Sequence, residues 1–132
     1  MILVDSDVLI AHLRGSEDAQ GWLLDARRKT GQLATSVVTV TEITGGMRTT
    51  ERREVTRLLS SLRLEPVGDR IALRAGEFMR QFHRSHSGIG LGDYLVAATA
   101  KVRGLELATL NIRHYPMFEG LVPPFQASAG PR

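Results

Sequence analysis

The sequence predicts an α/β domain of three layers, in which helices flank a central parallel sheet of four to five strands. Short apolar segments alternate with longer segments of helical periodicity, a pattern typical of parallel sheets. The first four residues, Met1 to Val4, are a continuous apolar run that suits a central strand buried on both faces. Polar residues follow it directly, at the carboxyl edge where parallel sheets bind ligands.

The composition indicates one domain. A chain of 132 residues is long enough to bury a single core without cross-links. We expect residues 1–125 to form this domain and the small, polar segment 126–132 to be a disordered tail. The chain has no cysteine, which excludes disulfides, a thiolate nucleophile and a cysteine-ligated zinc site. Because no signal peptide and no membrane-length apolar run is recognisable, we expect a cytoplasmic protein with no membrane partner.

Arginine dominates the basic residues. Fifteen of the seventeen are arginine, and the formal net charge is +3. Arginine binds phosphate through two parallel hydrogen bonds, so a nucleic acid or an acidic protein is a plausible partner. A bias in genome composition gives the same arginine content, so this observation is only a weak indication.

The first helix follows the first strand without a loop. Apolar spacing becomes helical from Val8 to Leu13. Ser16 is the expected cap of a second helix, which begins with acidic residues and stops at Gly31. Asp5 lies between strand and helix, where capping of the first helix is its simplest explanation.

The second strand is expected within residues 33–38, followed by a helix that begins near Thr39. Thr39 and Glu42 have the spacing of a capping box, in which the glutamate bonds back to the backbone of the cap residue. This gives Glu42 a purely structural explanation that is locally as good as a functional one.

The middle of the chain predicts two more helices. One is capped by Thr49 or Thr50, and the other extends from Asp69 to about His86. Residues 64–67 between them are a strand candidate that Pro66 restricts to a sheet edge. The two histidines near the end of the long helix, His83 and His86, are expected to be solvated, because no further metal ligand accompanies them.

The last strand–helix unit begins after the glycine-rich loop 87–92, which lacks the residues of a phosphate-binding loop. Asp93 lies in the first turn of the next helix, where the helix dipole favours an acid. A fourth strand is expected within 105–110, with Asn111 directly after it. Residues 121–122 are a candidate for a short edge strand.

Four polar side chains form the candidate site. Asp5, Glu42 and Asn111 each follow a predicted strand, and Asp93 begins the helix that precedes the last long strand. If the first and fourth strands are neighbours, these positions meet at one edge. Carboxylates gathered there repel one another unless a cation compensates, and oxygen ligands select Mg²⁺ or Mn²⁺. Such an ion polarises phosphoryl oxygens and activates water, which suits phosphodiester hydrolysis.

Four segments in this order resemble the PIN-domain family, and in particular the VapC-type toxin ribonucleases of type II toxin–antitoxin systems. They are ILVDSDVLI, SVVTVTEI, GLGDYLVAATA and LATLNIRHY. The resemblance implies a PIN domain over residues 1–125 and cleavage of tRNA or other structured or single-stranded RNA with Mg²⁺ or Mn²⁺. It makes Asp5 and Asp93 metal ligands and places the Ser6 hydroxyl beside them. Glu42 becomes a ligand through water or the activator of the attacking water.

The resemblance also implies partners. These are a second copy of the chain in a homodimer, and a cognate VapB-type antitoxin whose tail covers the acidic site in a toxin–antitoxin hetero-oligomer. An arginine of that tail would suit the carboxylates.

Asn111 is a departure from many members of this family, which have an aspartate at this position. Asparagine can orient a water or a ligand but contributes no charge to a second ion. We therefore expect one firmly bound ion, and a second only when RNA phosphate supplies oxygens. Asp7 either compensates for the missing charge or only supports the first helix. Arg113 and His114 are candidates for contact with RNA phosphate, with a structural or solvated role as the alternative for His114.

Few aromatic residues are left for RNA bases. Phe78, Phe82 and Trp22 are assigned to the core. Tyr94 and Tyr115 could stack on bases of single-stranded RNA, but packing in the core or at its rim is the first expectation for both.

Two other functions remain open. One is a PIN-fold metal-binding or protein-interaction domain with little nuclease activity, which the neutral Asn111 favours. The other is a PIN-type nuclease of RNA processing or DNA repair that is not a toxin.

Overall fold

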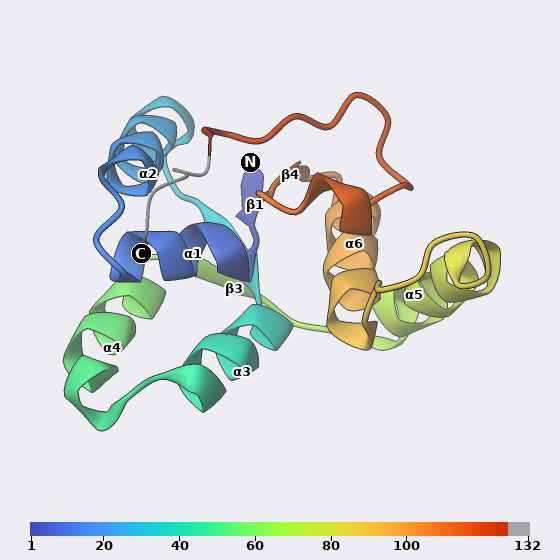
Figure 1. The fold of residues 1–132 in the computed structure, drawn as a ribbon, viewed down its shortest axis with the longest axis horizontal. Helices are drawn as coiled ribbons and strands as arrows, with labels where there is room; N and C mark the ends of the chain where they lie inside the picture. Colours follow the sequence, from blue (N-terminus) through green and yellow to red (C-terminus); the bar gives the residue numbers. More distant parts are fainter. Residues whose placement is uncertain (127–132) are drawn as a thin grey trace.

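The central sheet is parallel, with the strand order β3-β2-β1-β4, in a computed structural model that describes residues 1–126 (Figure 1). The strands are β1 (Ile2–Val4), β2 (Ala34–Ser36), β3 (Arg63–Glu65) and β4 (Glu106–Ala108). The α-helices are α1 (Ser6–Leu13), α2 (Glu17–Thr30), α3 (Val37–Gly46), α4 (Arg52–Ser60), α5 (Asp69–Phe82) and α6 (Leu91–Arg103). Two short 3₁₀ helices are η1 (Thr49–Glu51) and η2 (Ile112–His114). The predicted fold class and the pairing of the first and fourth strands are confirmed.

Two apolar clusters lie on opposite faces of the sheet, because neighbouring residues of a strand point in opposite directions. Leu3 of β1 packs in a cluster with residues of α5 and α6, whereas Val4 packs with residues of α1, α2 and α4. Both side chains are fully buried. Figure 1 shows α1, α2 and α4 on one side of β1 and α5 and α6 on the other. This arrangement holds β1 rigidly between two helical layers.

Helix α3 begins earlier than predicted, so the expected capping box is wrong. Ser36 is the cap residue, and its Oγ accepts a hydrogen bond from the Val38 N–H at 3.0 Å. Thr39 lies inside the helix and is completely buried. Ser36 and not Thr39 is the cap, because β2 is short and the serine at its end can accept a hydrogen bond from the backbone amide of the next turn. Glu42 is therefore in the second turn of α3, and capping no longer explains it.

The boundaries of the next two helices also differ from the prediction. Neither Thr49 nor Thr50 is the cap of the first one, which begins as η1 and continues as α4. The cap residue of η1 is Arg48, and its N–H donates to Oε1 of Glu51 at 2.7 Å. Helix α5 ends at Phe82 and not at His86. His83 and His86 are both exposed, in agreement with solvated histidines.

The segment after η2 crosses over the sheet without adding a strand. Residues 121–122, the candidate edge strand, have no strand conformation. Val122 is exposed and Leu121 packs against the α5 and α6 cluster. The prolines that follow have no N–H for a ladder. Of the expected tail, only Gln126 is described, and the other positions lie outside the described residues. In residues 1–126, no helix has both the length and the apolar character needed to cross a membrane.

Candidate active site

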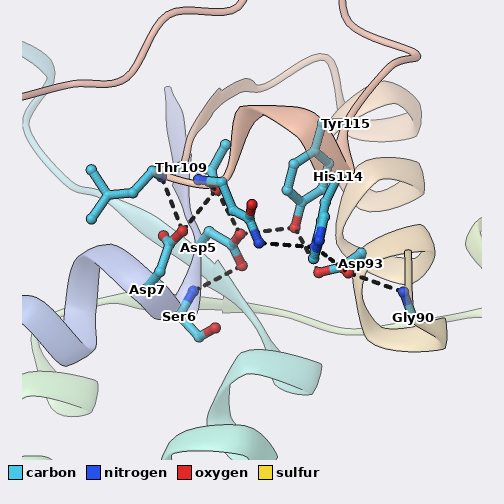
Figure 2. Close-up of polar contacts among 10 residues, drawn as sticks. Asp5, Ser6, Asp7, Gly90, Asp93, Thr109, His114 and Tyr115 are labelled. Carbon is cyan, nitrogen blue, oxygen red and sulfur yellow. Dashed lines mark hydrogen bonds and ion pairs between the residues drawn. The ribbon is translucent and has the colours of Figure 1, made fainter. Parts of the chain in front are cut away.

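Asp5 and Thr109 come to one point because each directly follows one of two paired strands. Val4 at the end of β1 is in register with Ala108 at the end of β4, and the Asp5 N–H donates to the Ala108 carbonyl at 2.9 Å. The next residues therefore leave the sheet together at its carboxyl edge. Figure 2 shows the polar network built there.

The Asp5 carboxylate is buried and accepts hydrogen bonds at both oxygens. Its Oδ1 accepts from the Ser6 N–H at 2.8 Å, so the predicted capping of α1 is real. Its Oδ2 accepts from the Thr109 hydroxyl at 2.9 Å and from the Tyr115 hydroxyl at 2.8 Å. Burial raises the pKa of Asp5, the hydrogen bonds oppose this effect, and repulsion by Asp93 adds to it. Asp5 therefore caps α1, but its carboxylate is also buried beside a second acid, which capping alone does not require.

Asp93 faces Asp5 from the first turn of α6. Its Oδ2 accepts from the Gly90 N–H at 3.1 Å and lies 3.0 Å from Nδ1 of His114. Its Oδ1 lies 3.4 Å from the Tyr115 hydroxyl, which thus lies between the two carboxylates (Figure 2). Helix α6 begins at Leu91, so Asp93 lies in its first turn as predicted, and it also belongs to the acidic pair.

Glu42 is oriented toward the same acids from α3. Loss of solvent raises its pKa first, and the charges of Asp5 and Asp93 raise it further, while the Ser6 hydroxyl acts in the opposite direction. Its Oε2 would lie 3.6 Å from a Cβ at Gly92. The absence of a side chain at that position allows α3 and α6 to approach closely beside the acidic pair.

Asn111 and His114 close the other side of the site. The Asn111 amide is 2.9 Å from Nδ1 of His114, the same nitrogen that contacts Asp93. The atom of Asn111 that faces His114 is the amide nitrogen Nδ2. These contacts correspond to the structural role that was the alternative to RNA contact for His114. Arg113 is exposed and has no ion pair with any residue in the described part of the chain.

The model of the PIN domain matches residues 2–117. The chain belongs to the PIN-domain family. Ribonuclease VapC10 of Mycobacterium tuberculosis is 65% identical over 125 residues, which cover 95% of this chain and 93% of that protein. Ribonuclease VapC19 of the same organism is 35% identical over 125 residues, covering 95% of this chain and all of that protein (100%). The resemblance to VapC-type proteins is thereby confirmed.

Solved structures agree with the fold of this PIN domain. A toxin–antitoxin complex from Klebsiella pneumoniae contains a chain with a TM-score of 0.77 and 26% identity, covering 96% of this chain and 100% of that one. A Rickettsia felis VapBC2 complex, bound to a DNA fragment from the promoter, gives a TM-score of 0.76 at 20% identity and covers 93% and 97% of the two chains.

The donor set of this PIN domain fits a hard divalent cation, because oxygen atoms of like-charged carboxylates converge on one edge of the sheet. Within residues 1–126, no group of three histidine, aspartate or glutamate side chains is packed closely enough to enclose an ion. Asp5 and Asp93 are the acids that could bind directly. Glu42 is suited to reach an ion through a water, and magnesium sites usually keep several waters.

Asp7 is bonded to the segment after β4. Its Oδ2 accepts from the Leu110 N–H at 3.0 Å and lies 3.1 Å from the Thr109 hydroxyl, whose one proton goes to Asp5 at the shorter distance of 2.9 Å. Its Oδ1 is buried and has no hydrogen-bond partner among the described residues. Burial, followed by the charge of Asp5, raises its pKa to about 6. Asp7 thus ties the start of α1 to the end of β4, in addition to its place in the first turn of the helix.

The polar partners of the acids are what sequence reasoning missed. Thr109 directly follows a strand, as Asp5 does, and that same signal could have identified it. The contact of Tyr115 with the acids had no local signal, because it depends on the path of η2. Tyr94 and Tyr115 are 2% and 1% exposed, so the expectation of packing is confirmed and neither side chain is available for stacking on a base.

Proposed function

We propose that this PIN domain is a Mg²⁺- or Mn²⁺-dependent endoribonuclease and the toxin of a VapBC-type toxin–antitoxin module. The observation that carries the proposal is the buried Asp5 carboxylate, joined to Asp93 through one hydroxyl at the carboxyl edge of the sheet. The similarity to two relatives named as ribonucleases supports RNA as the substrate. tRNA and other structured or single-stranded RNAs are the proposed substrates, and the cytoplasm is the proposed place of action.

Asp5 and Asp93 would hold the ion, and Glu42 would contribute through a water. When bound, the ion polarises a phosphoryl oxygen and makes a water more acidic. Glu42 would then serve as acceptor for the proton of the attacking water. Asn111, being neutral, orients a ligand or water without adding charge. One ion is therefore proposed for the free protein, with a second only when RNA phosphate supplies oxygens.

The remaining polar residues support this arrangement. Ser6 lies beside Glu42, and Asp7 fixes the segment that carries Asn111. Arg113 is exposed next to the site and free of ion pairs in the described part of the chain, so it is available for RNA phosphate.

The proposed partners are a cognate VapB-type antitoxin and a second copy of the chain. The likeness to a chain from a toxin–antitoxin complex supports the first of these. A DNA-binding protein encoded by a short adjacent reading frame, which co-purifies with this chain and blocks cleavage, is the expected finding. Such a frame also distinguishes a toxin from an RNA-processing nuclease.

The test of activity is cleavage of total RNA by the purified chain with Mg²⁺, Mn²⁺ or EDTA. Asp5→Ala and Asp93→Ala are compared with Asp18→Ala, which removes an exposed acid at the start of α2. We expect cleavage only with metal, its loss in the first two variants and its retention in the third. Equal cleavage by the wild type and all variants contradicts the site. An inactive wild-type protein that still binds Mn²⁺ favours the interaction domain.

A further inference from the structure

The Tyr115 hydroxyl is held at a fixed place between two carboxylates from distant parts of the chain. It donates to Oδ2 of Asp5 at 2.8 Å and lies 3.4 Å from Oδ1 of Asp93. The ring is fully buried and packs edge-on against Phe118, with ring centroids 6.3 Å apart. The Tyr115 N–H donates to the Ile112 carbonyl at 3.0 Å. Backbone and ring together leave the hydroxyl little freedom to move.

The hydrogen bonds around Asp5 leave it one open direction. An ionised carboxylate has about four lone-pair positions. Three are used, by the Ser6 N–H on Oδ1 and by the Thr109 and Tyr115 hydroxyls on Oδ2. The remaining position is on Oδ1. The carboxylate is thus oriented by its neighbours before any ligand arrives.

Asp93 also has one oxygen that is less occupied than the other. Its Oδ2 is occupied by the Gly90 N–H and by His114, while Oδ1 has only the longer contact with the Tyr115 hydroxyl. A hydroxyl has one proton, so the shorter bond to Asp5 is the strong one. Toward Asp93 the hydroxyl acts as a polar spacer that sets how far apart the two like charges stand.

We propose that Tyr115 is a positioning residue, whose hydroxyl holds the carboxylates of Asp5 and Asp93 at the separation that lets both bind one divalent ion. The inference rests on the proposed function, in which these two acids are the ligands. Hydrogen-bond partners of metal-binding carboxylates commonly change metal affinity or activity by about 10- to 100-fold when removed. Here a single residue serves both ligands.

Tyr94 provides a matched control. It is also a buried tyrosine, 2% exposed, but its hydroxyl has no hydrogen-bond partner in the described part of the chain. Tyr115→Phe and Tyr94→Phe therefore remove the same atom from two buried rings. Only the first change removes a contact with the acids.

The experiment measures Mn²⁺ affinity by calorimetry on the full chain without RNA, and kcat and KM on an RNA substrate. We expect Tyr115→Phe to weaken Mn²⁺ binding about 10-fold and to lower kcat by a similar factor with KM for RNA unchanged. We expect Tyr94→Phe to leave both within about twofold of the wild type, because no hydrogen bond is lost. Replacement of Tyr115 by 4-aminophenylalanine restores a donor and should recover most of the affinity.

Asp93→Asn separates this inference from the proposed function. If Tyr115→Phe binds Mn²⁺ and cleaves RNA as the wild type does, while Asp93→Asn does neither, the positioning role is wrong and the proposed function stands. If Asp93→Asn also behaves as the wild type, the proposed function itself fails. Should Tyr115→Phe not fold, the 4-aminophenylalanine chain decides. Affinity within about threefold of the wild type then supports the role, and a loss of about 10-fold overturns it.

Discussion

Asp7→Asn is the substitution with the most specific expected effect on stability. The pKa of Asp7 is raised from 3.8 to about 6, by burial first and by the charge of Asp5 second. Between these pH values the native state holds the proton more tightly than the unfolded chain does. The contribution of Asp7 to the free energy of unfolding therefore falls as the pH rises from about 4 to about 6, and the full cost persists above that range.

The size of the effect follows from the same values. The difference between 3.8 and about 6 corresponds to about 3 kcal/mol, and contact of the side chain with water reduces it. Asparagine has the same shape, can accept the bond from the Leu110 N–H and carries no charge that burial would penalise. We expect Asp7→Asn to raise the free energy of unfolding by about 1–3 kcal/mol at pH 7.5 and by about 0.5 kcal/mol at pH 4.

The assay is urea unfolding in EDTA at both pH values, followed by the fluorescence of Trp22. Asp25→Asn is the control, because it removes an exposed acid whose ion pair with Lys29 is on the surface, and less than about 0.5 kcal/mol is expected. A stability gain that is equal at both pH values, or a loss at pH 7.5, refutes the reasoning. RNA cleavage should be retained, and its loss would instead make Asp7 a participant in the reaction.

Three further outcomes are expected. Millimolar Mn²⁺ should raise the Tm by relieving carboxylate repulsion, and Asp93→Asn should weaken this rise in a thermal scan; no shift for the wild type contradicts a metal site. Ser36→Ala should cost about 1 kcal/mol in denaturant unfolding, because the bond that caps α3 is lost. Ile71→Ala should cost about 2–5 kcal/mol in the same measurement, since the side chain is fully buried; a cost below about 1 kcal/mol would mean that the α5 layer collapses around the gap.

The sequence predicted the parts of the fold that depend on local pattern. The apolar run before Asp5 gave the central strand, and strand–helix alternation gave the parallel sheet. The predicted start of α3 was wrong because Ser36 and Thr39 are both possible cap residues. Local spacing cannot decide between them, because the end of β2 is set by pairing with β1 and β3.

The candidate site was predictable to the extent that its residues follow strands. Asp5 and Asp93 meet as expected, through contacts with a shared hydroxyl. Tyr115 could not be assigned in advance, because its contact with Asp5 depends on the path of η2, which no local pattern predicts. The role of Asp7 also depends on the pairing of β1 with β4, since its hydrogen-bond partner lies beyond β4.

The separation of Asp5 and Tyr115 along the chain has a consequence for when the site is assembled during synthesis. Asp5 is translated before its hydrogen-bond donors Thr109 and Tyr115, which follow 104 and 110 residues later. At about 5–20 residues per second, that interval lasts roughly 5–20 s. The first acid thus emerges long before the groups that orient it, and no nascent chain that ends before Tyr115 contains the complete network. The hydrogen-bond network around Asp5 is therefore complete only after most of the domain has been synthesised.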